Sequence, residues 1–187
     1  MGENRWRTAD ALPVAGDARR GLVPPRRRAP DAAPRRTGAE HADGYRYDPD
    51  DPVPTLGGAT LNIPGGAYDQ RPIEGRCLVY TSAPLERDLT VIGDVRCVLH
   101  AMSTAPDTDF VVRLTDVHPD GTSRAPHATG SCARALPRVG EPAHVRSTPG
   151  RVHELTVDLW ATANTFRKGH RIRVAVTSSS FPASTAT

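Results

Sequence analysis

The sequence predicts an all-β protein, a β-sandwich or jelly roll, on three observations. Short runs rich in β-branched residues recur at close spacing, and each run is bounded by residues that favour turns. The 18 prolines and 16 glycines favour turns and short strands over long helices. No window of 11 residues shows the periodicity of an amphipathic helix. Many short strands separated by Gly/Pro turns are typical of sandwiches and jelly rolls.

The predicted strands begin near Cys77 and continue almost to the end of the chain. They cover Cys77–Thr81, Leu89–Ile92, Val95–Ala101, Phe110–Val117, Val152–Leu159 and Ile172–Thr177. In the run 152–159 polar and apolar side chains alternate, and the apolar side chains at 172, 174 and 176 share one face. Turn signals separate the runs at Gly93-Asp94, Pro119-Asp120-Gly121, Pro149-Gly150 and Lys168-Gly169.

The segments outside these runs differ in composition. Residues 1–16 mix Trp6 with charged residues, and residues 17–44 are dominated by Arg, Pro and Ala. The second segment holds too few large apolar residues to offset its ordering entropy, so we expect a disordered tail or linker there. Residues 45–58 are expected to form an ordered but irregular arm, and residues 122–148 an irregular segment. Nine arginines fall in the first 36 residues, so the positive net charge of +3 comes from this N-terminal part of the chain.

No candidate nucleophile has the required surroundings. A nucleophile elbow needs G-x-S-x-G, because its strained turn requires glycines around the serine. Gly130-Ser131 lacks the second glycine, and Ser178–Ser180 follow a strand with no glycine at the right place. We therefore predict no catalytic residue in this chain.

Metal and cofactor sites are not predicted either. The histidines His100, His118, His127, His144, His153 and His170 are scattered without ligand spacing. The acidic groups Asp48, Asp50, Asp51 and Asp107, Asp109 are interpreted as turn-capping carboxylates rather than calcium ligands. Phosphate-binding glycine loops are absent from the sequence.

Three cysteines, Cys77, Cys97 and Cys132, predict separate reduced thiols and a cytoplasmic location. The sequence has no apolar run of 18 residues and its N-terminus has no apolar signal-peptide core, so we expect no membrane association. The arginine-rich tail lacks interleaved aromatic residues, so nucleic-acid binding through it would be non-specific.

Three stretches, in this order, resemble one known family. The first is YRYDPDDPVPTLGG with GAYDQRPIEGR (Tyr45–Gly58 and Gly66–Arg76), the second is Leu78–Gly121, and the third is Pro149–Pro182. Together they are similar to the C-terminal domain of the CocE/NonD hydrolases, which include cocaine esterase, other acyl esterases and X-Pro dipeptidyl-peptidases. The opening MGENRWRTADALP resembles the end of the preceding catalytic α/β-hydrolase domain.

The resemblance implies a galactose-binding-like jelly roll over residues 45–187, behind a catalytic-domain remnant at 1–16. In the family this domain packs on the α/β-hydrolase and cap domains of the same chain. The Ser, Asp and His of the family lie upstream of Met1, so no catalytic residue carries over and we expect the chain to be inactive alone. The parent reaction would be hydrolysis of an ester or an Xaa-Pro peptide bond through an acyl-enzyme.

Departures from the family pattern suggest an incomplete sandwich. The arginine tail and the stretch Thr129–Ala135 stand where the family has strands, and the chain ends at Thr187 where the family continues. With suitable codons, a reading frame shifted by one nucleotide translates the DNA for TGSCARA as D-G-I-L-R-A-R. A shifted frame likewise translates the DNA for LVPP as W-Y-L. We therefore hypothesise that residues 17–42 and 122–147 are out-of-frame readings of a fragment. Missing strands would leave exposed edges and a marginal, aggregation-prone fold.

Two other functions stay open, and so does the oligomeric state. A free-standing carbohydrate- or protein-binding jelly roll would need exposed aromatic residues, for which Tyr68, Tyr80, Trp160 and Phe166 are available. The arginine-rich tail would be the binding element of a nucleic-acid-binding protein.

Overall fold

The computed structural model describes residues 42–58, 64–105, 108–125 and 149–182, with positions 2, 3, 5, 6, 8, 10, 11, 21 and 22. The elements are α1 (Arg71–Glu74), β1 (Leu78–Thr81), β2 (Leu89–Ala101), β3 (Val111–Val117), β4 (Ser123–Arg124), β5 (His153–Phe166) and β6 (Arg171–Thr177). Apart from α1, every regular element in this part of the chain is a strand, which confirms the predicted all-β class.

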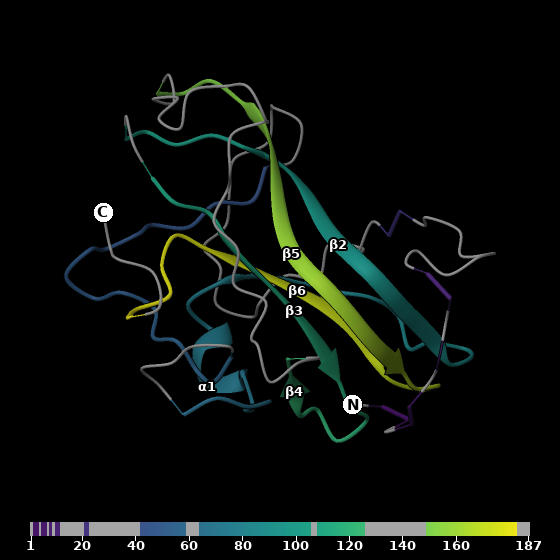
Figure 1. Ribbon diagram of the computed structural model, residues 1–187. Helices are drawn as coiled ribbons and strands as arrows, with labels where there is room; N and C mark the ends of the chain where they lie inside the picture. Colours follow the sequence, from purple (N-terminus) through teal and green to yellow (C-terminus); the bar gives the residue numbers. More distant parts are fainter. Residues whose placement is uncertain are drawn as a thin grey trace.

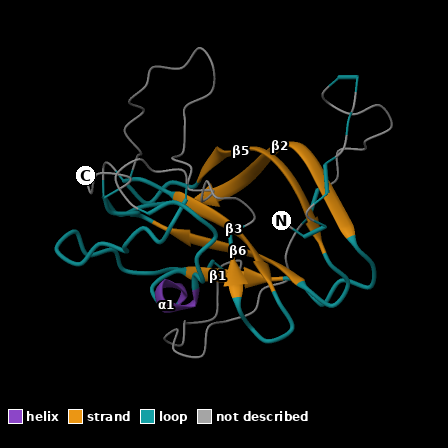
Figure 2. Cartoon of the chain, turned by 60° about the horizontal axis from the view of Figure 1, so that its bottom comes forward, coloured by secondary structure: helices purple, strands orange, loops and turns teal. Residues whose placement is uncertain are grey.

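The strands form two antiparallel sheets. One sheet has four strands in the order β1-β6-β3-β4, and the other is a long ribbon of β2 and β5. The ribbon arches across β3 and β6 (Figure 1), and a second view shows it as a separate layer above the four-stranded sheet (Figure 2). The arrangement is a β-sandwich with layers of unequal size; its jelly-roll type stays a prediction.

The main core lies between the two sheets. Its buried side chains come from β3, β5 and β6: Val112, Leu114, Val157, Leu159, Phe166, Ile172 and Val176. A smaller cluster of Val53, Ile73, Cys77 and Ala175 lies apart from it. Every residue of β3 is buried, because side chains alternate across the sheet and both faces of this central strand are covered.

The arm at residues 45–58 packs onto the segment that follows β6. Pro54 forms a parallel bridge with Phe181, in which the Thr55 amide donates to the Phe181 carbonyl (2.7 Å) and the Phe181 amide donates to the Val53 carbonyl (2.9 Å). The arm supplies Val53 to the smaller cluster and α1 supplies Ile73, while Cys77 and Ala175 of β6 complete it. This part of the chain is ordered without being a regular strand, as the sequence predicted.

Two predicted boundaries were wrong in the ribbon. Gly93-Asp94 is not a turn, because both residues pair with β5 inside the continuous strand β2. The predicted strand end at Leu159 is too early, because β5 continues through Trp160 to Phe166. The register shifts between Asp94 and Arg96, so Leu159 and Trp160 together face Val95 in a β-bulge.

The segment predicted as irregular begins later than residue 122. Ser123 and Arg124 form β4 and pair with β3, and Ser123 is fully buried. The rest of that segment, residues 126–148, lies outside the described residues, as do 23–41 in the arginine tail and the terminal 183–187. In the part that is described, no helix has the length and apolar character to cross a bilayer.

Candidate functional site

The three consecutive serines after β6 were the nearest sequence candidates for a nucleophile. The structure buries all three, and each hydroxyl is hydrogen-bonded to the arm. Ser178 Oγ lies 2.6 Å from the Tyr45 hydroxyl, Ser179 Oγ accepts from the Val53 amide at 2.8 Å, and Ser180 Oγ lies 2.7 Å from Thr55 Oγ1. Burial raises the pKa of the Tyr45 phenol above its ordinary value. The serine run thus fastens the arm and presents no hydroxyl to a substrate.

Arg113 completes this buried polar contact from the middle of β3. Its side chain is 4% exposed, and its guanidinium donates to Ser180 Oγ at 2.9 Å and contacts Cys77 Sγ at 3.9 Å. A buried guanidinium needs satisfied hydrogen bonds to offset its desolvation. Arg113, Ser180 and Thr55 therefore form one linked group of structural polar side chains.

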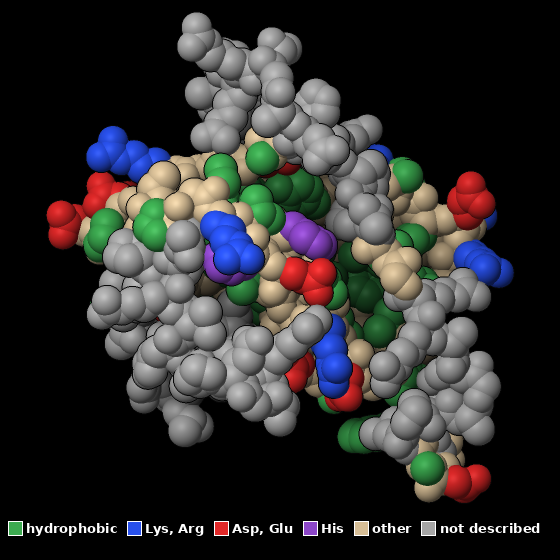
Figure 3. Space-filling model, turned by 90° about the horizontal axis from the view of Figure 1, so that it is seen from above, with side chains coloured by type: hydrophobic (Ala, Val, Ile, Leu, Met, Phe, Trp, Pro, Cys, Tyr) green, Lys and Arg blue, Asp and Glu red, His purple; other side chains and the backbone are tan. Residues whose placement is uncertain are grey.

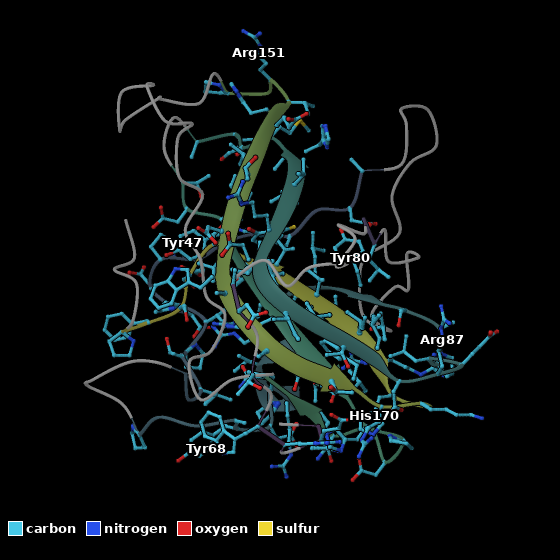
Figure 4. The ribbon with its side chains drawn as sticks, turned by 45° about the vertical axis from the view of Figure 1, so that its right-hand side comes forward. Tyr47, Tyr68, Tyr80, Arg87, Arg151 and His170 are labelled. Carbon is cyan, nitrogen blue, oxygen red and sulfur yellow. The ribbon has the colours of Figure 1, made fainter. Side chains whose placement is uncertain are left out.

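A second polar group brings together three residues that the sequence left apart. Asp116 is in β3, His118 is in the turn that follows β3, and His170 directly precedes β6. Antiparallel pairing of Val117 with Arg171 places these strand ends side by side. One ligand atom from each of the three residues lies within 4.8 Å of the others. Figure 4 shows His170 at the end of the sandwich opposite Arg151.

The histidine cluster corrects one sequence interpretation. The histidines were judged scattered because the sequence shows no metal-ligand spacing among them. His118 and His170 are 52 positions apart in the sequence, yet strand pairing brings their rings to a centroid distance of 4.4 Å. The only sequence feature that could have paired them is that both lie beside predicted turns at the ends of strands. His127 and His144 lie outside the described residues.

The other acidic and histidine candidates take ordinary structural roles. Asp48 Oδ1 accepts from the Asp50 amide at 3.0 Å, and Asp51 pairs with Arg76 at 2.7 Å. His100 lies 3.4 Å from Glu154 on the ribbon. The capping interpretation of Asp48 is therefore confirmed, whereas Asp107 lies outside the described residues.

The outer surface of the ribbon carries exposed apolar side chains. Trp160 is 63% exposed, and Val98, Met102 and Val152 are each more than half exposed. At the end where β5 begins, hydrophobic side chains also lie in a hollow of the surface (Figure 3). Large exposed aliphatic and aromatic groups mark surfaces that bind another protein surface.

Among the described residues, one shallow hollow lies beside α1. It measures about 420 Å³ and is lined by residues 65–69 and Arg124. The Asp69 carboxylate in it already accepts from the Arg71 side chain, the Arg71 amide and the Ser123 amide. Of the aromatic residues proposed for glycan binding, Tyr68 and Trp160 are exposed, but Tyr68 lies in the loop before α1 and Trp160 lies in β5.

The comparison with known proteins identifies the chain. The family described as X-Pro dipeptidyl-peptidase C-terminal non-catalytic domain matches residues 1–187, the whole length. The chain belongs to this family. The resemblance drawn from the three sequence stretches is thereby confirmed.

Relatives of this C-terminal domain are much longer proteins. A cocaine esterase from Rhodococcus sp. (strain MB1 Bresler) is 42% identical over 150 residues, which are 78% of this chain and 26% of the esterase. The chain spans about a quarter to a third of the length of the curated relatives it matches.

Two solved structures contain a similarly folded part. An aminopeptidase from a marine sediment Thaumarchaeota archaeon matches with a TM-score of 0.61 and 30% identity, covering 75% of this chain and 26% of the aminopeptidase. An α-amino acid ester hydrolase matches with a TM-score of 0.59 and 26% identity, covering 72% of this chain and 24% of the hydrolase. The matched part is therefore a minor fraction of the cocaine esterase, the aminopeptidase and the ester hydrolase.

Proposed function

We propose that the chain is the non-catalytic C-terminal domain of a CocE/NonD-type serine hydrolase whose catalytic α/β-hydrolase domain belongs to the same parent polypeptide. The observation that carries the proposal is the 42% identity to a cocaine esterase of which the chain covers only 26%. The buried serines agree with it, since their hydroxyls hold the arm in place. The parent reaction is hydrolysis of an ester or an Xaa-Pro peptide bond, with water as the final acyl acceptor.

In this proposal the ribbon provides the contact with the catalytic domain. Exposed Trp160 and Val98 would be buried in the parent, since an interface core is built from aromatic and large aliphatic groups. The domain supplies no reacting group. By packing against the catalytic domain it would hold in place the loops that surround the active site. We further propose a cytoplasmic location, supported by Cys77 and Cys97, neither of which is in a disulfide.

The decisive experiment has two parts. Resequencing from about a kilobase upstream of Met1 to beyond Thr187 tests whether a hydrolase reading frame with a nucleophile elbow runs into MGENRWR. A fluorophosphonate probe, which labels activated serines, is then applied to the 187-residue chain and to the reconstructed parent. We expect labelling of the parent only.

Two outcomes would overturn the proposal. Labelling of the isolated chain would mean that it carries its own nucleophile. Upstream DNA without any hydrolase frame would mean that the chain is an independent or decayed β module, and glycan-array binding would then test the carbohydrate-binding alternative.

A further inference from the structure

We propose that Asp116, His118 and His170 form a binding site for one divalent transition-metal ion of the zinc class. The site is independent of the proposed hydrolase, because its three residues lie in strand ends and turns of this domain alone. Two imidazoles and a carboxylate are a ligand set that suits Zn²⁺ and the related ions Co²⁺ and Ni²⁺.

The distances between the three side chains fit one shared ion. His170 Nδ1 lies 2.9 Å from Asp116 Oδ1, and His118 Nε2 lies 4.0 Å from Asp116 Oδ2. Zn²⁺ binds nitrogen and carboxylate oxygen at about 2.0–2.2 Å, so two ligand atoms on one ion lie roughly 3–3.5 Å apart. The first distance (2.9 Å) is just below this range and the second (4.0 Å) is above it, so small rotations of the side chains would bring all three ligand atoms to one ion.

The orientation of the two rings agrees with the distances. The imidazole centroids of His118 and His170 are 4.4 Å apart, and their planes are tilted by 35°. Two imidazoles on one tetrahedral ion, with bonds of about 2.0–2.1 Å, have centroids roughly 5 Å apart. The rings of His118 and His170 are slightly closer than joint ligation requires, and a bound ion would take the place of the hydrogen bond between Asp116 and His170.

The backbone around the site is fixed from both sides. Asp116 is held by pairing of β3 with β6 and with β4. The His118 amide donates to the Thr122 carbonyl (2.9 Å), and the His170 amide donates to the Arg167 carbonyl (3.0 Å). Two hydrogen-bonded turns and a central strand therefore present the ligands, which lowers the ordering cost of binding.

Burial and charge also favour a cation. The side chains of Asp116 and His170 are 10% and 15% exposed, whereas that of His118 is 37% exposed, so one side of the site opens to solvent for a bound water. The carboxylates of Asp120 and Asp88 interact electrostatically with His118 and His170, respectively. Of the cationic residues near the site, Arg167 has its guanidinium paired with Asp88 at 2.7 Å, whereas Lys168 donates to Asp88 only through its backbone amide.

Titration of the untagged 187-residue chain with ZnCl₂ by calorimetry tests the proposal, with Co²⁺ absorption as a second readout. We expect one ion per chain and a tetrahedral Co²⁺ spectrum. His118→Ala should weaken binding tenfold or more, because it removes one ligand from an exposed turn. His100→Ala is the matched control, since His100 is an exposed histidine paired with Glu154 on the ribbon, and it should bind as the unmodified chain does.

The interpretation depends on folded protein, so the circular dichroism spectrum of each variant is compared with that of the unmodified chain. Asp116→Asn, which keeps the side-chain shape, provides a second loss-of-ligand variant. Absence of saturable one-to-one binding, or equal binding by His118→Ala and the unmodified chain, would overturn the proposal. The three side chains would then serve only to hydrogen-bond the ends of β3 and β6 to each other.

Discussion

At the scale of single residues, hydroxyl groups decide how the arm is attached. Thr55 and Ser180 share a buried hydrogen bond of 2.7 Å, and Ser180 also accepts from Arg113. Arg113 is a buried charged donor and needs an acceptor. Removing a hydroxyl from this group would leave a buried polar atom without a hydrogen bond, which costs its full desolvation free energy.

Replacing Thr55 with valine removes this hydroxyl and keeps the side-chain shape. We expect Thr55→Val to lower the free energy of unfolding by roughly 1–3 kcal/mol. The control is Thr104→Val at an exposed position, where the change should stay within about 0.5 kcal/mol. Urea denaturation followed by fluorescence measures both; equal effects would mean that the buried hydroxyl pair contributes nothing specific.

Asp88 makes the stability depend on acidity. The Lys168 backbone amide and the Arg167 guanidinium hold the pKa of Asp88 below its ordinary value. A lowered folded-state pKa gives a stabilisation that is present above the unfolded-state pKa and is lost as the pH falls through the folded-state pKa.

Stability should therefore fall as the pH drops through and below 3.8, the ordinary pKa of an aspartate, and Asp88→Asn should make that fall shallower. Asp94→Asn, at an exposed carboxyl on β2, is the control. Thermal unfolding measured at successive pH values provides the comparison. A slope that Asp88→Asn leaves unchanged would contradict the assigned hydrogen bonds.

At the scale of elements, the bulge in β5 determines which side chains face the core. Before the bulge the inward positions of β5 are odd, ending at Val157 and Leu159; after it they are even, at Thr162, Asn164 and Phe166. The extra residue, Trp160, has a φ of 62°, in the left-handed region. The bulge therefore corrects the register at the cost of one strained backbone position.

Variants at Trp160 separate this strain from the side chain. Both Trp160→Gly and Trp160→Ala remove the mostly exposed indole, but only glycine adopts a positive φ without penalty. We expect the glycine variant to be more stable than the alanine variant by roughly 1–2 kcal/mol. Chemical denaturation of the two proteins gives the difference, and equal stabilities would argue against strain at this residue.

Gly93 shows the same principle on the facing strand. Its φ is 104° and no atom lies within 4 Å of an added Cβ, so Gly93→Ala would meet backbone strain and no clash. We expect a loss of roughly 1–2 kcal/mol in the free energy of unfolding.

Gly75 is the matched control for this substitution. It also has open space for a Cβ, but its φ of −62° suits any residue. Gly75→Ala should be neutral or stabilising by about 0.4–1 kcal/mol. A loss equal to that of Gly93→Ala would show that the conformation of Gly93 is not the cause.

At the scale of the whole molecule, the two sheets differ in how many of their strands have a neighbour on both sides. Among the described residues, the ribbon has only two strands, so one side of each strand lacks a neighbour. Asn164 on the ribbon is 2% exposed, and neither amide atom has a partner in the described structure. An unpaired strand side favours association, and a buried unpaired amide lowers stability.

We therefore expect the chain made alone to unfold below about 50 °C, at the low end of the mesophilic range, and to associate as its concentration rises. Calorimetry and light scattering at several concentrations measure both properties. A cooperative transition above that temperature, with a monomer at every concentration, would contradict the expectation.

The sequence by itself determined the all-β class, the position of most strands and the family. Local signals sufficed for these: alternation at 153–159 and at 172–176, turn residues between runs, and three motif stretches in order. They failed inside the ribbon, because the bulge at Trp160 changes the inward parity and the inward residues beyond it are the polar Thr162 and Asn164.

Only the tertiary structure decided the roles of the serine run and the histidines. Ser180 meets Thr55 across 125 residues of sequence, and His170 meets Asp116 across 54. Contacts over such separations depend on strand order and register. Hydrophobic alternation in the sequence predicts which face of a strand is buried, but it does not predict which other strand is the partner. Pairing of β3 with β6 is what turns separate polar residues into a site.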